Sequence, residues 1–255
     1  MHGLLKPELP CTAATASADA ASITLTATFD GSDPGYPFAV AVDFRYTLNA
    51  EGLTIEVTAK NVTADGGAAP FMVGWHPWFC VGETADAVVH LDPRSSWNVC
   101  DHKGEIPGTH AAGYEDVVPT GTATAFESFN GQPLGDNCKP PCMALLARGA
   151  RCATLSPNTL PVLAVWDDGI KAVSPAGKVG TLETRIADSS GDAAVLWQDA
   201  QHRFIQVYTG QAKAGLVAVE PMSGSTDCFN NGDGLVVLQA GEEWYGAFGV
   251  KMAEA

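Results

Sequence analysis

The amino-acid sequence predicts an all-β fold built from many short antiparallel strands. Valine, threonine and alanine gather in short segments, and several of these alternate apolar and polar residues with a period of two. The 255 residues include 27 glycines and 16 prolines, which suit the turns between such segments. No segment shows a long apolar stripe with a 3.6-residue period, so helices should be short and few.

The first three strands are predicted at 22–29, 38–48 and 53–61. The turn residues GSDPG and NAEG separate these segments, which predicts an antiparallel meander. In the second strand, one face should be buried and the opposite face solvated. The residues expected on the buried face are Phe38, Val40, Val42 and Phe44, and those expected on the solvated face are Asp43 and Arg45.

Eight further segments have the composition of strands. They are 87–91, 161–166, 181–187, 193–197, 203–209, 215–220, 234–239 and 245–252. The middle third, 92–143, is rich in glycine, proline and asparagine, and in an all-β protein such segments form the loops that build sites. Neither an internal repeat nor a linker divides the chain, so residues 1–255 are expected to form a single domain.

The charge of the chain limits the partners it can bind. Its formal net charge is −15, which argues against nucleic acid and against an anionic membrane surface, because both require a positive patch. A neutral or cationic small molecule is the expected partner. The sequence gives no indication of the oligomeric state.

The cysteines and the N-terminus predict the compartment. Seven cysteines are an odd number without a framework of regular spacings, which suits a reducing environment. No apolar run approaches the length of a membrane span, and the first residues, MHGLLKPELPC, are too short and too interrupted by proline for a signal peptide. We therefore expect a soluble cytoplasmic protein.

Three local motifs are expected to be structural. Cys138 and Cys142 lack a second pair of ligands at zinc spacing. The stretch DCFNNGDG, 227–234, lacks the carboxylates of a calcium loop and is interpreted as a hairpin turn. Asn61 begins a formal glycosylation sequon and is interpreted as a strand end. No metal site is expected.

His76 is the first candidate for chemistry. It lies in the stretch APFMVGWHPWF, 69–79, between tryptophan and proline. A histidine among aromatic residues is either a hydrogen-bonded core residue or a proton donor held in a cleft. Pro77 restricts the backbone of His76 and would stiffen the turn that aims the imidazole.

Glu220 is the second candidate. Leu216, Ala218 and Glu220 share one face of a predicted strand, and Pro221 is expected to end the ladder just after the carboxylate. A carboxylate at that point lies either at an exposed strand end or at the mouth of a pocket.

These motifs, with YPF at 36–38, VPTG at 118–121, FIQVYTG at 204–210 and VAVEPMSGSTDCFNNGDGLVVLQAGE at 217–242, follow in an order that resembles the aldose 1-epimerase (galactose mutarotase) family. The opening HGLL at 2–5 is similar to that family's His-Gly segment. The resemblance spans nearly the whole chain. It implies a large antiparallel β-sandwich, the mutarotase-like supersandwich, in a member that lacks the family's first strands.

The resemblance also implies the site and the reaction. His76 would be the general acid and Glu220 the general base, with His2 as an accessory site histidine and Asp136 as the nearest match to a site aspartate. Trp78 and its aromatic neighbours would form an apolar wall against the C–H face of a sugar. Interconversion of the α and β anomers of an aldohexose needs one base and one acid, and neither a metal nor an organic cofactor.

Two alternatives stay open. One is a weak or inactive family member that binds carbohydrate or serves as a structural partner. The other is a phosphorylated sugar as substrate, although the acidic chain offers few cationic anchors for a phosphate. The remaining histidines, His90, His102, His110 and His202, are expected to have surface roles, His102 and His110 in the irregular loop and His202 in a turn.

Overall fold

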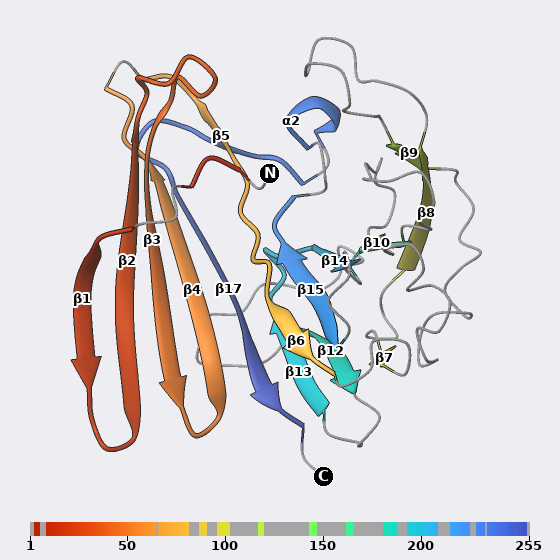
Figure 1. Cartoon of the computed structure of the whole chain (residues 1–255). Helices are drawn as coiled ribbons and strands as arrows, with labels where there is room; N and C mark the ends of the chain where they lie inside the picture. Colours follow the sequence, from red (N-terminus) through yellow and green to blue (C-terminus); the bar gives the residue numbers. More distant parts are fainter. Residues whose placement is uncertain are drawn as a thin grey trace. The chain divides into compact units, whose positions relative to one another are not determined.

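The computed structural model confirms an all-β architecture (Figure 1). It describes residues 3–5, 9–64, 66–81, 87–90, 96–102, 117–119, 143–146, 162–165, 181–187, 193–208, 215–224, 228–232 and 234–253. Within these ranges the chain forms antiparallel strands and a single four-residue helix, α2 (Cys228–Asn231). No helix in this part of the chain is long and apolar enough to cross a membrane.

The chain divides into two compact units, and each is described by itself. Unit 1 comprises Met1–Phe71 and Val236–Lys251, and unit 2 comprises Met72–Leu235 and Met252–Ala255. The expectation of a single domain stays a prediction.

Unit 1 contains the predicted meander. Five of its strands pair in the order β1-β2-β3-β4-β17, drawn mostly in red and orange in Figure 1. The strands are β1 (Cys11–Ala16), β2 (Ala20–Asp30), β3 (Ala39–Asn49), β4 (Gly52–Asn61) and β17 (Glu243–Met252). A small second sheet pairs β5 (Ala69–Phe71) with β16 (Val236–Leu238).

The alternation predicted for β3 is confirmed. Val40, Val42 and Phe44 are buried, whereas Asp43 and Arg45 are exposed. Phe38 lies just before the strand and is half-buried. On the neighbouring strand β4, the side chains that face the same way are also fully buried, so this face of the sheet is the core of unit 1. The buried residues of β4 are Ile55, Val57 and Ala59.

Asn61 ends β4 inside the protein. It is 0% exposed, and its Nδ2 donates to Gly67 O and to Leu238 O, both at 2.8 Å. Its Oδ1 accepts from the backbone N–H of Thr63 at 2.9 Å. The amide is therefore used as a structural crosslink, which confirms the interpretation of the sequon as a strand end.

Unit 2 contains two sets of paired strands. One has the order β13-β12-β7, and the other has the order β6-β15-β14-β11-β8-β9, with β10 also paired to β14. In chain order the strands are β6 (Trp78–Cys80), β7 (Val88–His90), β8 (Ser96–His102), β9 (Val117–Pro119), β10 (Met143–Leu146), β11 (Val162–Val165), β12 (Leu182–Ala187), β13 (Ala193–Gln198), β14 (Phe204–Tyr208) and β15 (Leu216–Met222). Each of the eight segments predicted as strands after the meander coincides with a strand of the structure.

Two predictions about the β15 region are wrong. The stretch 227–234 is not a hairpin turn, because it contains α2 and the flanking strands β15 and β16 belong to different sheets. Pro221 does not end the ladder, because β15 continues through it to Met222. The carbonyl of Pro221 accepts from Trp75 N on the side away from β14, so its missing N–H removes no bond to β14.

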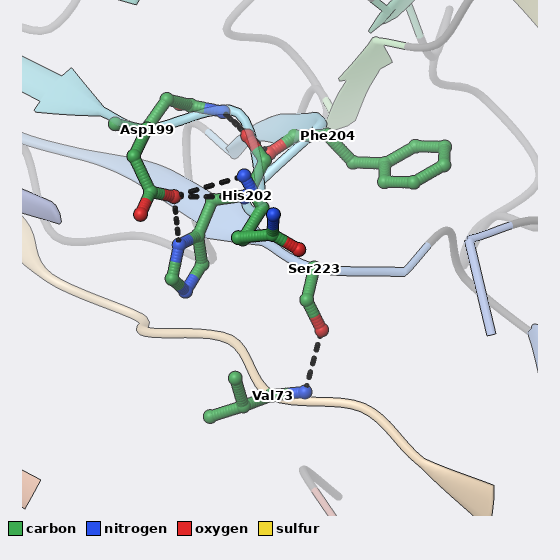
Figure 2. Close-up of polar contacts among 7 residues, drawn as sticks. Val73, Asp199, His202, Phe204 and Ser223 are labelled. Carbon is green, nitrogen blue, oxygen red and sulfur yellow. Dashed lines mark hydrogen bonds and ion pairs between the residues drawn. The ribbon is translucent and has the colours of Figure 1, made fainter. Parts of the chain in front are cut away.

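Two predictions about histidines are also wrong. His202 has no surface role, because it is 0% exposed and its Nδ1 lies 3.0 Å from Asp199 Oδ1 (Figure 2). The buried amide of Gln198 donates to the carbonyls of His202 and Phe204, and these buried hydrogen bonds stabilise the turn that contains His202. His102 ends strand β8 instead of lying in an irregular loop. His90 is exposed as expected, and His110 lies outside the described residues.

Candidate active site

Strand β15 carries Glu220 and pairs on one side with β6 and with the residues that precede β6. Ala218 pairs with Trp78, and Met222 pairs with Gly74. Between these two pairings lie three residues on each segment, 75–77 and 219–221, so the strand register is the same before and after them. All of these residues belong to unit 2.

His76 and Glu220 are the middle residues of the two three-residue segments and therefore lie directly opposite each other. Trp75 N donates to Pro221 O at 3.1 Å, which makes the adjacent His76/Glu220 pair a non-hydrogen-bonded pair of the antiparallel ladder. Side chains approach most closely in such pairs. Nε2 of His76 accordingly lies 3.2 Å from Oε1 of Glu220.

A proline lies in each of the two backbone pairs that flank His76 and Glu220. In an unbroken ladder, Pro77 would donate to Val219 O and Pro221 would donate to Trp75 O, but proline has no N–H. Each flanking pair can therefore form at most one backbone hydrogen bond. The two candidate residues face each other where the ladder between their strands is weakest.

Ser223 closes the ladder beyond this weak point. Its N–H donates to Val73 O at 2.8 Å. Its Oγ accepts from Val73 N at 2.9 Å, as Figure 2 shows. In a regular ladder the carbonyl of Ser223 would be that acceptor, but β15 ends at Met222. The hydroxyl replaces the carbonyl and keeps the segment before His76 paired.

The carboxyl group of Glu220 is buried and the imidazole of His76 is partly accessible. Glu220 is 5% exposed, and burial raises the pKa of its carboxyl from 4.5 to about 8. His76 contacts Oε1, but no donor in the described part of the chain makes a well-aligned hydrogen bond to this oxygen. The His76 side chain is 24% exposed and can meet a ligand.

Trp78 extends this face of the sheet toward solvent. Its ring lies 5.3 Å from the His76 ring between centroids, with an interplanar angle of 34°. Trp78 is 45% exposed, and the residue opposite it, Ala218, has only a methyl group. An exposed indole beside an acid–base pair is a suitable platform for the apolar face of a sugar ring.

The structure thus brings three of the five predicted site residues together: His76, Glu220 and Trp78. His2 and Asp136 lie outside the described residues. Ser223 was not predicted as a site residue. It stands in the quoted motif VEPMSG, but its partner Val73 follows from the strand register, which the sequence does not reveal. Among the described residues, no group of three or more His, Cys, Asp and Glu side chains is placed to hold a metal ion.

A sequence model of the family described as aldose 1-epimerase matches residues 8–251. The chain belongs to the aldose 1-epimerase family. Its sequence is similar to the uncharacterized protein YihR of Escherichia coli (strain K12), with 25% identity over 236 residues. That alignment covers 88% of this chain and 59% of YihR, so the chain spans less than two thirds of the length of this curated relative.

Solved structures share the fold of this family member. A galactose mutarotase-like protein from Clostridium acetobutylicum superposes with a TM-score of 0.63 at 15% identity, covering 97% of this chain and 67% of that one. The GalM/aldose epimerase homologue from C. elegans superposes with a TM-score of 0.56 at 14% identity, covering 95% and 68%. The likeness confirms the galactose mutarotase-like antiparallel fold that the sequence motifs imply.

Proposed function

We propose that this chain is an aldose 1-epimerase that interconverts the α and β anomers of an aldohexose such as glucose or galactose. The observation that carries the proposal is the cross-strand pair of His76 and Glu220, whose reactive atoms lie 3.2 Å apart beside an exposed tryptophan. Family membership supports a sugar as the ligand.

The pair suits the two proton transfers of ring opening. The carboxylate of Glu220 takes the proton from the anomeric hydroxyl while the imidazolium of His76 delivers a proton to the ring oxygen. The bond between C1 and the ring oxygen breaks, and the C1–O bond becomes the aldehyde carbonyl. Because both oxygens are attached to C1, an acid and a base in direct contact can reach them together.

Ring closure reverses the same steps on the other face of the aldehyde. After rotation about the C1–C2 bond, neutral His76 takes the proton back from the C5 hydroxyl as its oxygen attacks C1. Protonated Glu220 returns its proton to the carbonyl oxygen, which becomes the new anomeric hydroxyl. Both residues regain their starting protonation states, so the cycle consumes no cofactor.

The other candidate site residues have supporting roles in this proposal. Trp78 would lie against the C–H face of the sugar, and His2 and Asp136 would bind its hydroxyl groups. The net charge of −15 favours a neutral sugar. We further propose a cytoplasmic location, which the unpatterned cysteines favour.

Polarimetry tests the proposal. Freshly dissolved α-glucose or α-galactose loses its initial optical rotation as it equilibrates, and an epimerase accelerates this decay in proportion to its concentration. Wild-type protein should do so for at least one of the two sugars. If the decay stays at the background rate while calorimetry detects sugar binding, the protein is an inactive carbohydrate-binding member and the proposed activity is wrong.

A further inference from the structure

Ser223 is placed to control the distance between His76 and Glu220. It is 2% exposed and makes two hydrogen bonds with Val73, three residues before His76. Ser223 also follows Glu220 by three residues on the other segment. On the N-terminal side of His76, Val73 and Ser223 are therefore the nearest pair joined by two hydrogen bonds, one between backbone groups and one to the serine hydroxyl.

Two prolines increase the contribution of the Val73/Ser223 pair to holding the segment before His76 in place. The backbone pairs on each side of His76 and Glu220 contain Pro221 and Pro77, so neither can form its second hydrogen bond. With these bonds absent, the bond from Trp75 N to Pro221 O and the two bonds between Val73 and Ser223 hold the segment before His76 against β15. The acceptor for Val73 N is a side-chain hydroxyl, which a single substitution can remove.

We propose that Ser223 is a positioning residue that holds His76 against Glu220 through the hydrogen bond from Val73 N to Ser223 Oγ. The kinetic part of this inference rests on the proposed epimerase function, whereas the geometric part does not. Removing the hydroxyl leaves the buried N–H of Val73 without its acceptor, and the segment can satisfy that N–H only by moving. A misplacement of about 1 Å in a catalytic pair can lower the rate by about 100-fold.

The kinetic experiment compares Ser223→Ala and Ser223→Thr with Thr63→Val. Thr63 is the matched control in unit 1, because its Oγ1 also accepts a backbone N–H, that of Ala39 at 3.2 Å. We expect kcat of Ser223→Ala to fall by about 10- to 100-fold with little change in KM. Ser223→Thr keeps the hydroxyl and should restore kcat, and Thr63→Val should keep it. A wild-type kcat in folded Ser223→Ala would overturn the proposal.

A second experiment needs no activity and separates the two proposals. NMR titration of ¹⁵N in the His76 ring and ¹³C in the Glu220 carboxyl should give shared inflections in the wild type, because contacting groups titrate as a pair. In Ser223→Ala the two groups should titrate separately, and in Thr63→Val they should titrate together. If Ser223→Ala does not fold, Ser223→Cys, with a weaker acceptor, takes its place. Shared inflections in the folded Ala or Cys variant would overturn the positioning role, whatever the activity.

Discussion

The carboxyl group of Glu220 combines burial with contact to His76, and burial dominates its ionisation. Because burial raises its pKa from 4.5 to about 8, the folded protein binds a proton that the unfolded chain releases between these values. Its contribution to stability is fully present below pH 4.5 and is lost as the pH rises through 8. The carboxyl group of Glu220 therefore costs stability at the pH at which it is ionised.

Glu220→Gln should remove this pH-dependent cost. The difference in unfolding free energy between the variant and the wild type should grow in favour of the variant by at most about 4 kcal/mol between pH 5 and pH 8.5. Denaturant unfolding at the two pH values measures the difference, in which titration of other groups cancels. An equal difference at both values would show that the carboxyl has an ordinary pKa in the folded protein.

The same pKa predicts the acidic limb of the pH–rate profile. The mechanism needs ionised Glu220 and protonated His76 together, so kcat/KM should be bell-shaped in pH, and the raised pKa of Glu220 should place its acidic limb well above pH 4.5. Polarimetric rates corrected for the uncatalysed reaction at each pH give the profile. An acidic limb centred near pH 4.5 would contradict the raised pKa of Glu220.

At the scale of the elements, Asn61 connects three parts of unit 1. Its side chain bonds the strand end to the loop at Gly67 and to β16 at Leu238. Asn61→Ala would leave buried backbone groups without partners, and we expect a loss of about 2–4 kcal/mol in unfolding free energy.

Asn49→Ala is the matched control for this prediction. Asn49 accepts one backbone hydrogen bond, from Glu51 N, in an exposed turn. Its loss should cost at most about 1 kcal/mol. Chemical denaturation of both variants decides the matter, and similar costs would show that the Asn61 crosslink contributes little.

The elements also show where prediction from sequence succeeds. The alternating segments of β2, β3 and β4 reveal their period directly, because their apolar residues are large. Strand β1, CTAATA, escapes prediction because all six residues are small or polar and all are exposed. The helix α2 escapes because CFNN has no apolar period and lies within a run that also favours turns.

The candidate site also has features that the sequence predicts and features that it does not. His76 and Glu220 stand out as titratable residues in apolar segments, and the motif resemblance identifies them. Their direct opposition depends on the register between two segments about 140 residues apart, which local pattern does not encode. The burial of His202 was missed for a similar reason, since its partners Gln198 and Asp199 surround it only in the folded turn.

At the scale of the whole molecule, the net charge of −15 should affect substrate choice. The negative potential lowers the local concentration of anions, so kcat/KM for glucose should exceed that for glucose 6-phosphate. Raising the ionic strength from about 0.01 M to about 0.5 M should reduce the difference in kcat/KM between the two sugars, because salt screens the repulsion between the protein and the phosphate. The rate of anomer exchange can be measured by NMR for both glucose and glucose 6-phosphate. Faster exchange of the phosphate ester at low salt would indicate a cationic site and contradict the neutral-sugar proposal.

The central claim is that His76 and Glu220 act as one acid–base unit, and the most direct test is the mutarotation rate of four proteins: wild type, His76→Asn, Glu220→Gln and the double variant. Each single substitution should lower the catalysed rate by about 10²- to 10⁴-fold. The double variant should be little worse than either, because residues that act as a unit are strongly non-additive. Wild-type rates in both folded single variants, or a double loss equal to the product of the single losses, would contradict the claim.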